Sequence, residues 1–123
     1  MTVFDSNAIL RYILQDNEEM ADSVEERINQ KDCFVPTEVV AEIVYVLSKV
    51  YDTPRPAISS AVLRVLDMEG IQTADYDVAA KALETYAATS LDFVDCLMAG
   101  YQNAGHTVFT FDKALRKYLA KDQ

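Results

Sequence analysis

The sequence has little of what several kinds of protein depend on. Its 123 residues include no tryptophan, three glycines, three prolines, two cysteines and one histidine. So few glycines and prolines argue against a fibrous repeat or a disordered chain. The two cysteines and the histidine lack the paired spacing of a zinc site, and no segment approaches the ~18 consecutive apolar residues of a membrane helix. We therefore expect a compact globular protein that does not span a membrane.

Positive charge is also scarce. The chain has 11 Lys and Arg against 20 Asp and Glu, a formal net charge of −9. Because nonspecific nucleic-acid binding depends on Lys and Arg contacts to phosphate, this balance argues against a broad grip on RNA or DNA. It leaves room for a local basic rim, for a cation that bridges acid to phosphate, or for a basic protein partner.

The start of the chain and the cysteines bear on where the protein works. The segment MTVFDSNAILRYIL lacks the basic start of a signal peptide and contains Asp5. Cys33 and Cys96 lie far apart in apolar settings, which is typical of buried, reduced thiols. Both features predict a cytoplasmic protein, and its length predicts a single domain over residues 1–123.

Apolar periodicity predicts strands that alternate with helices along the chain. Strands are expected at residues 2–5, 33–36, 71–75 and 106–111. Helices are expected at residues 7–14, 16–30, 37–50, 57–69, 78–88, 91–105 and 112–121. Such alternation predicts an α/β fold with a parallel sheet covered on both faces by helices.

Four carboxylates are candidates for a functional site: Asp5, Glu42, Asp95 and Asp112. Asp5 and Asp112 each follow an apolar run at the expected end of a strand, and ligands of open α/β sheets bind at that edge. Like charges within ~4 Å repel by ~4 kcal/mol at an effective dielectric near 20, so a cluster is tolerated mainly with a cation. Hard ions such as Mg²⁺ favour carboxylate oxygens. The pattern therefore predicts a divalent metal site.

Each acid also has an ordinary explanation. Asp5 and Asp112 can cap the helices that follow them. Glu42 belongs, with Glu38, to a polar stripe on an otherwise apolar helix, which is typical of a solvated face. Periodicity alone does not rank Glu42 above Glu38.

Asp95 is the hardest of the four to explain as a surface residue. Its neighbours in LDFVDCLMAG are mostly apolar, and a carboxylate in such a setting is costly to bury unless it is paired or bound to metal. Asp92 precedes it by three residues, which places both on one helix face about 5 to 6 Å apart.

Basic residues near the expected site are candidates for substrate binding. Arg11, Lys113 and Arg116 could contact phosphate, with an RNA-facing rim on the last helix. A surface ion pair for Arg11, and stabilisation of the helix dipole by the bases of the last helix, are the alternatives.

Four segments, in this order and spacing, resemble the successive motifs of PIN domains, and most closely those of VapC-type toxins. They are FDSNAILRYIL, PTEVVAEIVYVLSKVY, LDFVDCLMAGYQNAG and VFTFDKAL. The resemblance covers essentially the whole chain. It selects Glu42 over Glu38 and makes Asp5, Glu42, Asp95 and Asp112 an acidic quartet. It also implies that Asn7 and Thr110 support the site and that Asp92 is an additional acid.

The resemblance implies a three-layer α/β/α sandwich about a short parallel sheet, and RNA cleavage that depends on Mg²⁺ or Mn²⁺. Asp5 and Asp95 would bind metal directly, while Glu42 and Asp112 would bind a second ion or position water. It further implies a toxin silenced by a cognate antitoxin, and a homodimer. Because the chain is acidic, we expect a short single-stranded loop of a structured RNA, such as tRNA or rRNA, as the target.

Two alternatives remain open. A receiver-like signalling domain would need five βα units and adjacent acids after the first strand, whereas four strands are expected here and Asp75 is the one candidate phosphoacceptor. A catalytically silent PIN-like interaction module would be expected to lack one of the four acids, and none is missing.

Overall fold

The computed structural model describes residues 1–121 and shows a mostly helical α/β protein. The helices are α1 (Ser6–Leu14), α2 (Glu18–Asn29), α3 (Thr37–Lys49), α4 (Arg55–Leu66), α5 (Tyr76–Ala88), α6 (Phe93–Asn103) and α7 (Lys113–Lys121). The strands are β1 (Cys33–Val35) and β2 (Ile71–Thr73). All seven predicted helices are therefore confirmed, with ends that shift by a few residues. The short parallel sheet is confirmed too, as part of an α/β sandwich.

The sheet is small, and β1 is its centre. β1 pairs in parallel with β2 from Cys33 opposite Ile71 to Val35 opposite Thr73. On the other side of β1, the Phe34 N–H donates a hydrogen bond to the Thr2 carbonyl at 2.8 Å. The Phe34 carbonyl accepts one from the Phe4 N–H at 2.9 Å. Val3 forms one isolated parallel bridge there. The strand predicted at residues 2–5 is thus reduced to a single bridge beside β1.

The strand predicted at residues 106–111 is wrong, because this segment has no strand structure. Phe109 and Phe111 are 85% and 81% exposed. Their rings pack edge to face, with the ring centres 5.3 Å apart. Leu115 of α7 packs against Ala99 of α6 in a separate apolar cluster. That packing holds the segment near α6, where its alternating apolar residues have no neighbouring strand to pair with.

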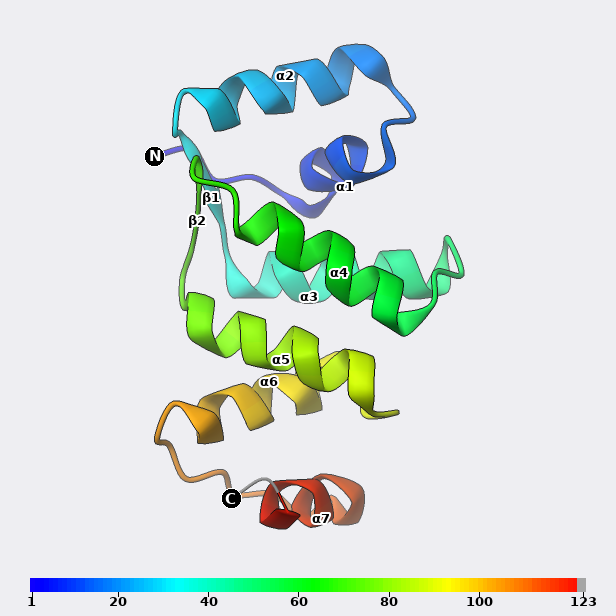
Figure 1. The fold of residues 1–123 in the computed structure, drawn as a ribbon, viewed down its shortest axis with the longest axis vertical. Helices are drawn as coiled ribbons and strands as arrows, with labels where there is room; N and C mark the ends of the chain where they lie inside the picture. Colours follow the sequence, from blue (N-terminus) through cyan, green and yellow to red (C-terminus); the bar gives the residue numbers. More distant parts are fainter. Residues whose placement is uncertain (122–123) are drawn as a thin grey trace.

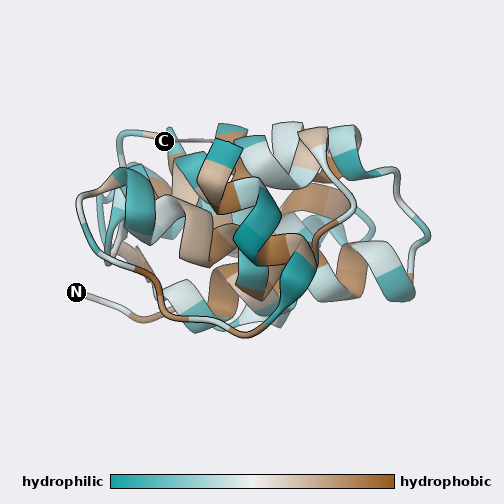
Figure 2. Cartoon of the chain, turned by 90° about the horizontal axis from the view of Figure 1, so that it is seen from below, coloured by the Kyte–Doolittle hydropathy of each residue, from teal (hydrophilic) through white to brown (hydrophobic). Residues whose placement is uncertain are grey.

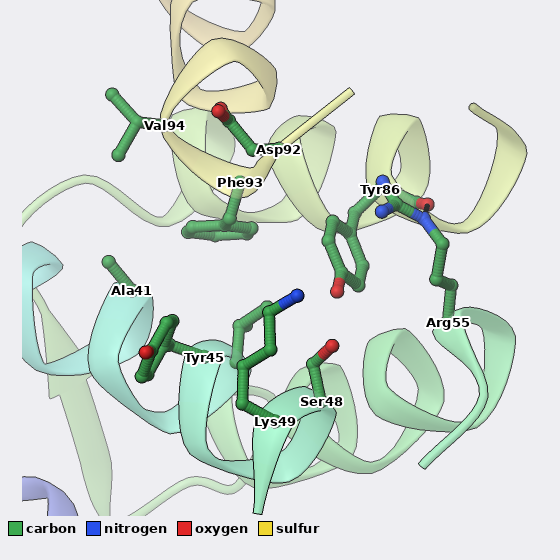
Figure 3. Close-up of a pocket in the computed structure, with 10 residues that line it drawn as sticks. Ala41, Tyr45, Ser48, Lys49, Arg55, Tyr86, Asp92, Phe93 and Val94 are labelled. Carbon is green, nitrogen blue, oxygen red and sulfur yellow. Dashed lines mark hydrogen bonds between the residues drawn. The ribbon is translucent and has the colours of Figure 1, made fainter. Parts of the chain in front are cut away.

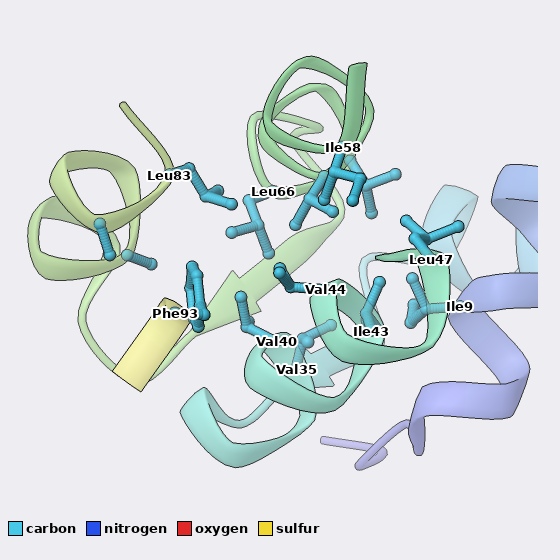
Figure 4. Close-up of a cluster of buried hydrophobic side chains, with 14 of the residues drawn as sticks. Ile9, Val35, Val40, Ile43, Val44, Leu47, Ile58, Leu66, Leu83 and Phe93 are labelled. Carbon is cyan, nitrogen blue, oxygen red and sulfur yellow. The ribbon is translucent and has the colours of Figure 1, made fainter. Parts of the chain in front are cut away.

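The main hydrophobic core surrounds α3. Val40, Ile43, Val44 and Leu47 recur at helical spacing and are buried, which accounts for the inward face of this helix. Figure 4 shows them among Val35 of β1 and apolar side chains from α1, α4, α5 and α6. Figure 1 shows the helices stacked from α2 at the top to α7 at the bottom, with the strands at the left. Seen from below in Figure 2, many of the apolar stretches are parts of helices near the middle of the molecule.

Among residues 1–121, no helix is both long enough and apolar enough to cross a membrane.

Both cysteines are expected to react slowly with alkylating reagents. Cys33 and Cys96 are fully buried, and burial raises the pKa of each thiol to about 11, since it disfavours the charged thiolate. At pH 8 the native protein should therefore react with iodoacetamide on the order of 100-fold more slowly than the same protein in urea. Mass spectrometry of the labelled protein over time measures both rates. Equal rates in buffer and in urea would contradict the burial of the thiols.

Candidate functional site

The acidic pair Asp92 and Asp95 lies at the start of α6. Asp92 is the N-cap of this helix, and its Oδ1 accepts a hydrogen bond from the Asp95 N–H at 3.1 Å. Asp95 is half-buried in the first turn. Burial raises the pKa of Asp95 above its ordinary value, and the negative charges of Asp92 and Asp112 raise it further. A cation bound beside Asp95 would relieve this repulsion.

Asp112 reaches the same region from the segment before α7. Its Oδ1 accepts a hydrogen bond from the Leu115 N–H at 2.8 Å and so caps α7. The Asp112 N–H donates to the Thr110 hydroxyl at 3.1 Å. Thr110, predicted to support the site, therefore contacts the backbone of Asp112, and its role in the site stays a prediction.

Asp5 and Glu42 lie on other helices. Asp5 caps α1 by accepting a hydrogen bond from the Ala8 N–H at 2.9 Å, and Asn7 is exposed in the first turn of that helix. Glu42 is exposed on α3. The ordinary explanation of Asp5 and Asp112 as helix caps thus holds. A carboxylate has about four lone-pair sites, so capping does not prevent it from binding metal as well.

The acids are only partly assembled. Within residues 1–121, no three His, Cys, Asp or Glu side chains lie close enough together to hold a metal ion. The acids that shift the pKa of Asp95 are Asp92 and Asp112, and neither Asp5 nor Glu42 is among them. Mg²⁺ is usually held by one or two carboxylates together with water and substrate phosphate. Asp95 with one neighbouring carboxylate has the right donor atoms for such a minimal site.

The predicted substrate-binding residues differ in their surroundings. The Arg11 guanidinium forms an ion pair with Asp16 at 2.7 Å and donates to the Tyr51 hydroxyl at 3.2 Å. The Arg11 guanidinium is therefore already paired within the protein. Lys113 and Arg116 are exposed on α7, directly after Asp112. Of the three, these two are better placed to meet a substrate at the acids.

A cavity of about 380 Å³ between α3 and α6 was not expected from the sequence. Figure 3 shows it beside Asp92, with side chains from α3, α4, α5 and α6 around it. Arg55 closes one side: its guanidinium lies 3.6 Å from the centre of the Tyr86 ring, and it donates to the carbonyls of Tyr86 and Leu91. The polar stripe on α3 was visible in the sequence. Its apposition to Tyr86 and Phe93 was not, because these residues are distant along the chain.

A short parallel sheet packed against helices, with acids at the start of α6, defines an α/β domain with a candidate acidic site. The chain belongs to the PIN domain family, whose family model matches residues 2–120. No curated protein and no solved structure shows a significant match to it. PIN domains form a superfamily of nucleases that generally use divalent metals, so family membership sets aside the receiver-like alternative.

Proposed function

We propose that this chain is a metal-dependent endoribonuclease of the VapC toxin type. The observation that carries the proposal is the PIN-domain match over residues 2–120, together with the position of Asp95, a half-buried carboxylate beside Asp92 and near Asp112. A carboxylate with like-charged neighbours in a partly buried place is typical of a functional site. Family membership gives the reaction class, and the acids give the chemistry of the site.

The acids have distinct roles in this proposal. Asp95 and Asp5 bind a divalent ion directly, Mg²⁺ or Mn²⁺, while Glu42 and Asp112 bind a second ion or position the attacking water. Asp92 adds charge beside Asp95 and orients α6 through its cap. The bound ion supplies Lewis acidity and lowers the pKa of water. Asp5, before α1, and Glu42, on α3, would supply the remaining carboxylates of the quartet.

The proposed biology follows from the same resemblance. The protein acts in the cytoplasm as a homodimer, and a cognate antitoxin bound in or near the acidic site silences it. Its substrate is a single-stranded loop of a structured RNA such as tRNA or rRNA. The net charge of −9 supports a small RNA contact, since a long duplex would require many more basic residues. Lys113 and Arg116 are the proposed phosphate contacts of α7.

The rival function is a catalytically silent PIN-like interaction module. The observation in its favour is that, within residues 1–121, no three of the acids are gathered closely enough to hold a metal ion. A silent module would still bind partners through its surface, but it would leave RNA intact under all metal conditions.

Cleavage of labelled RNA separates the two functions. The purified protein with end-labelled tRNA and rRNA fragments is expected to give internal cuts in Mg²⁺ or Mn²⁺, leaving 5′-phosphate and 3′-hydroxyl ends. EDTA should stop cleavage, and excess Mg²⁺ should restore it. Sequencing of RNA ends after induced expression identifies the target. Intact RNA in both assays would contradict the nuclease and support the silent module.

A further inference from the structure

The cavity between α3 and α6 has no role in the proposed acidic site, and of the acids named above only Asp92 lines it. Its volume of about 380 Å³ lies in the range of roughly 300 to 1,000 Å³ that is usual for small-ligand sites. Such sites combine apolar and aromatic walls with a few polar groups that orient the ligand. The side chains that matter for its chemistry are Tyr45, Ser48, Lys49, Tyr86, Asp92 and Phe93. This combination suits a flat aromatic ligand that carries negative charge.

Aromatic rings provide the surface for such a ligand. Tyr45 is 62% exposed, although it is a large aromatic residue on the helix at the centre of the core. Behind it, Tyr86 and Phe93 are buried and pack edge to face, with their ring centres 5.9 Å apart. The buried pair makes a firm apolar wall, while Tyr45 offers a ring that a base can stack on.

Polar groups point into the same space. Figure 3 shows the Lys49 amine and the hydroxyls of Ser48 and Tyr86 directed toward one another between the helices. Hydroxyls donate and accept hydrogen bonds, as the edges of nucleobases require, and the ammonium group of Lys49 attracts phosphate. Asp92 lies at the α6 side of the cavity and repels phosphate, so the favourable position for a phosphate is near Lys49.

Two residues that line the cavity lie on the same face of α3 as Glu42, one of the proposed acids. Glu42, Tyr45 and Lys49 are all exposed, and their spacing places them on one side of the helix. Seven residues of helix separate Glu42 from Lys49 by about 10 Å along the axis. One end of this surface therefore carries the Glu42 carboxylate and the other end carries the Lys49 amine, with Tyr45 between them.

We propose that this cavity binds one unstacked base of a single-stranded RNA substrate, which stacks on Tyr45 while its phosphate pairs with Lys49. The proposal rests on the proposed ribonuclease function and deepens it, because it states which form of RNA the site accepts. Stacking gives affinity that depends little on basic residues. It therefore explains how a chain with a net charge of −9 holds RNA at all. A base inside a duplex is unavailable to the cavity, so paired RNA is excluded.

Binding of 5′-AMP and 5′-CMP, followed by NMR without divalent ions, tests the base site. Ribose 5-phosphate is the matched probe that has the phosphate but no base. We expect the nucleotides to bind about tenfold more tightly than ribose 5-phosphate, with shifted signals at Tyr45 and Phe93. Tyr45→Ala should weaken nucleotide binding about tenfold, which corresponds to the loss of one base–aromatic stack, and should leave ribose 5-phosphate unaffected. Lys49→Gln should weaken both probes.

Two exposed residues away from the cavity provide controls. Tyr76, at the start of α5, bonds Asp67 and lines a different cavity, so Tyr76→Ala should bind nucleotides like the wild type. Arg64→Gln on α4 is the matched control for Lys49→Gln. Equal affinity for 5′-AMP and ribose 5-phosphate, or equal binding by Tyr45→Ala and Tyr76→Ala, would overturn the base site.

Cleavage measured in parallel keeps this inference separate from the nuclease function. In an active enzyme, Tyr45→Ala should raise KM about tenfold and change kcat much less, because Tyr45 holds substrate without touching the scissile bond. If the wild type cleaves RNA and Tyr45→Ala has the same KM, the base site is wrong while the nuclease function stands. Nucleotide binding through Tyr45 without any cleavage would support the base site and count against the nuclease.

Discussion

Asp95→Asn is expected to abolish metal-dependent RNA cleavage while leaving the fold intact. Asn has the same shape as Asp but no charge, so it removes the carboxylate that the proposed metal site depends on. A loss of about 100-fold or more is expected, equivalent to roughly 3 kcal/mol of transition-state stabilisation. Cleavage of end-labelled RNA in Mg²⁺ measures the loss, and circular dichroism checks the fold.

The same substitution should not lower stability. Burial raises the pKa of the Asp95 carboxyl, and repulsion by Asp92 and Asp112 raises it further. Removing that charge relieves the repulsion, so the melting temperature without metal should stay equal or rise. Mg²⁺ should raise the melting temperature of the wild type, because an ion that binds the folded state stabilises it. This increase should be lost in Asp95→Asn.

Matched variants show whether the effect belongs to the site. Asp5→Asn should also abolish cleavage, and α1 should persist because Asn caps helices about as well as Asp. Asp22→Asn, in an exposed part of α2, changes net charge equally and should retain full activity. Cleavage retained by both Asp5→Asn and Asp95→Asn would refute the proposed acidic site.

Gly70→Ala is expected to have the largest effect on stability. Gly70 is buried just before β2, and a Cβ atom there would lie 1.8 Å from the Ile28 carbonyl oxygen of α2. The clash is with backbone, so it is relieved only if α2 and the start of β2 move apart. We expect a loss of about 3 kcal/mol in the free energy of unfolding, at the upper end of the usual cost of overpacking. Urea denaturation followed by circular dichroism measures it.

Gly105→Ala is the control for this prediction. Gly105 has a φ of +105°, but nothing lies within 4 Å of the position of an added Cβ. Its replacement should therefore cost only the backbone strain, about 1 to 2 kcal/mol. A loss for Gly70→Ala no greater than that for Gly105→Ala would show that the packing of α2 on β2 is looser than the structure describes.

Helices were predicted well because their cause is local. The spacing of Val40, Ile43, Val44 and Leu47 predicts both a helix and its buried face, and the structure shows both. The Asp residues before α1 and α7 predict caps, and both caps are present. Each of these features depends on residues within one or two turns, so a single sequence contains the necessary information.

Strands were predicted less well because their partners are distant. The alternation of Val108, Phe109, Thr110 and Phe111 is compatible with a strand, yet a strand forms only where a neighbour supplies hydrogen bonds. The α6–α7 packing holds the segment elsewhere. The partners of Arg11 could not be predicted from the sequence either. Its ion pair with Asp16 and its hydrogen bond to the Tyr51 hydroxyl depend on how the chain turns after α1 and on where α3 ends.

The sequence by itself determined the helices, their buried faces, the capping acids and a resemblance to PIN domains that the family match bears out. Tertiary structure alone decided the two-stranded sheet, the proximity of Asp112 to Asp95, and the cavity that Tyr45 lines together with Tyr86 and Phe93. The physical reason is the sequence separation of the residues that make each kind of contact. Helical hydrogen bonds and caps join near neighbours, whereas strand pairing, charge clusters and cavities arise from contacts between distant segments that only the packed core brings together.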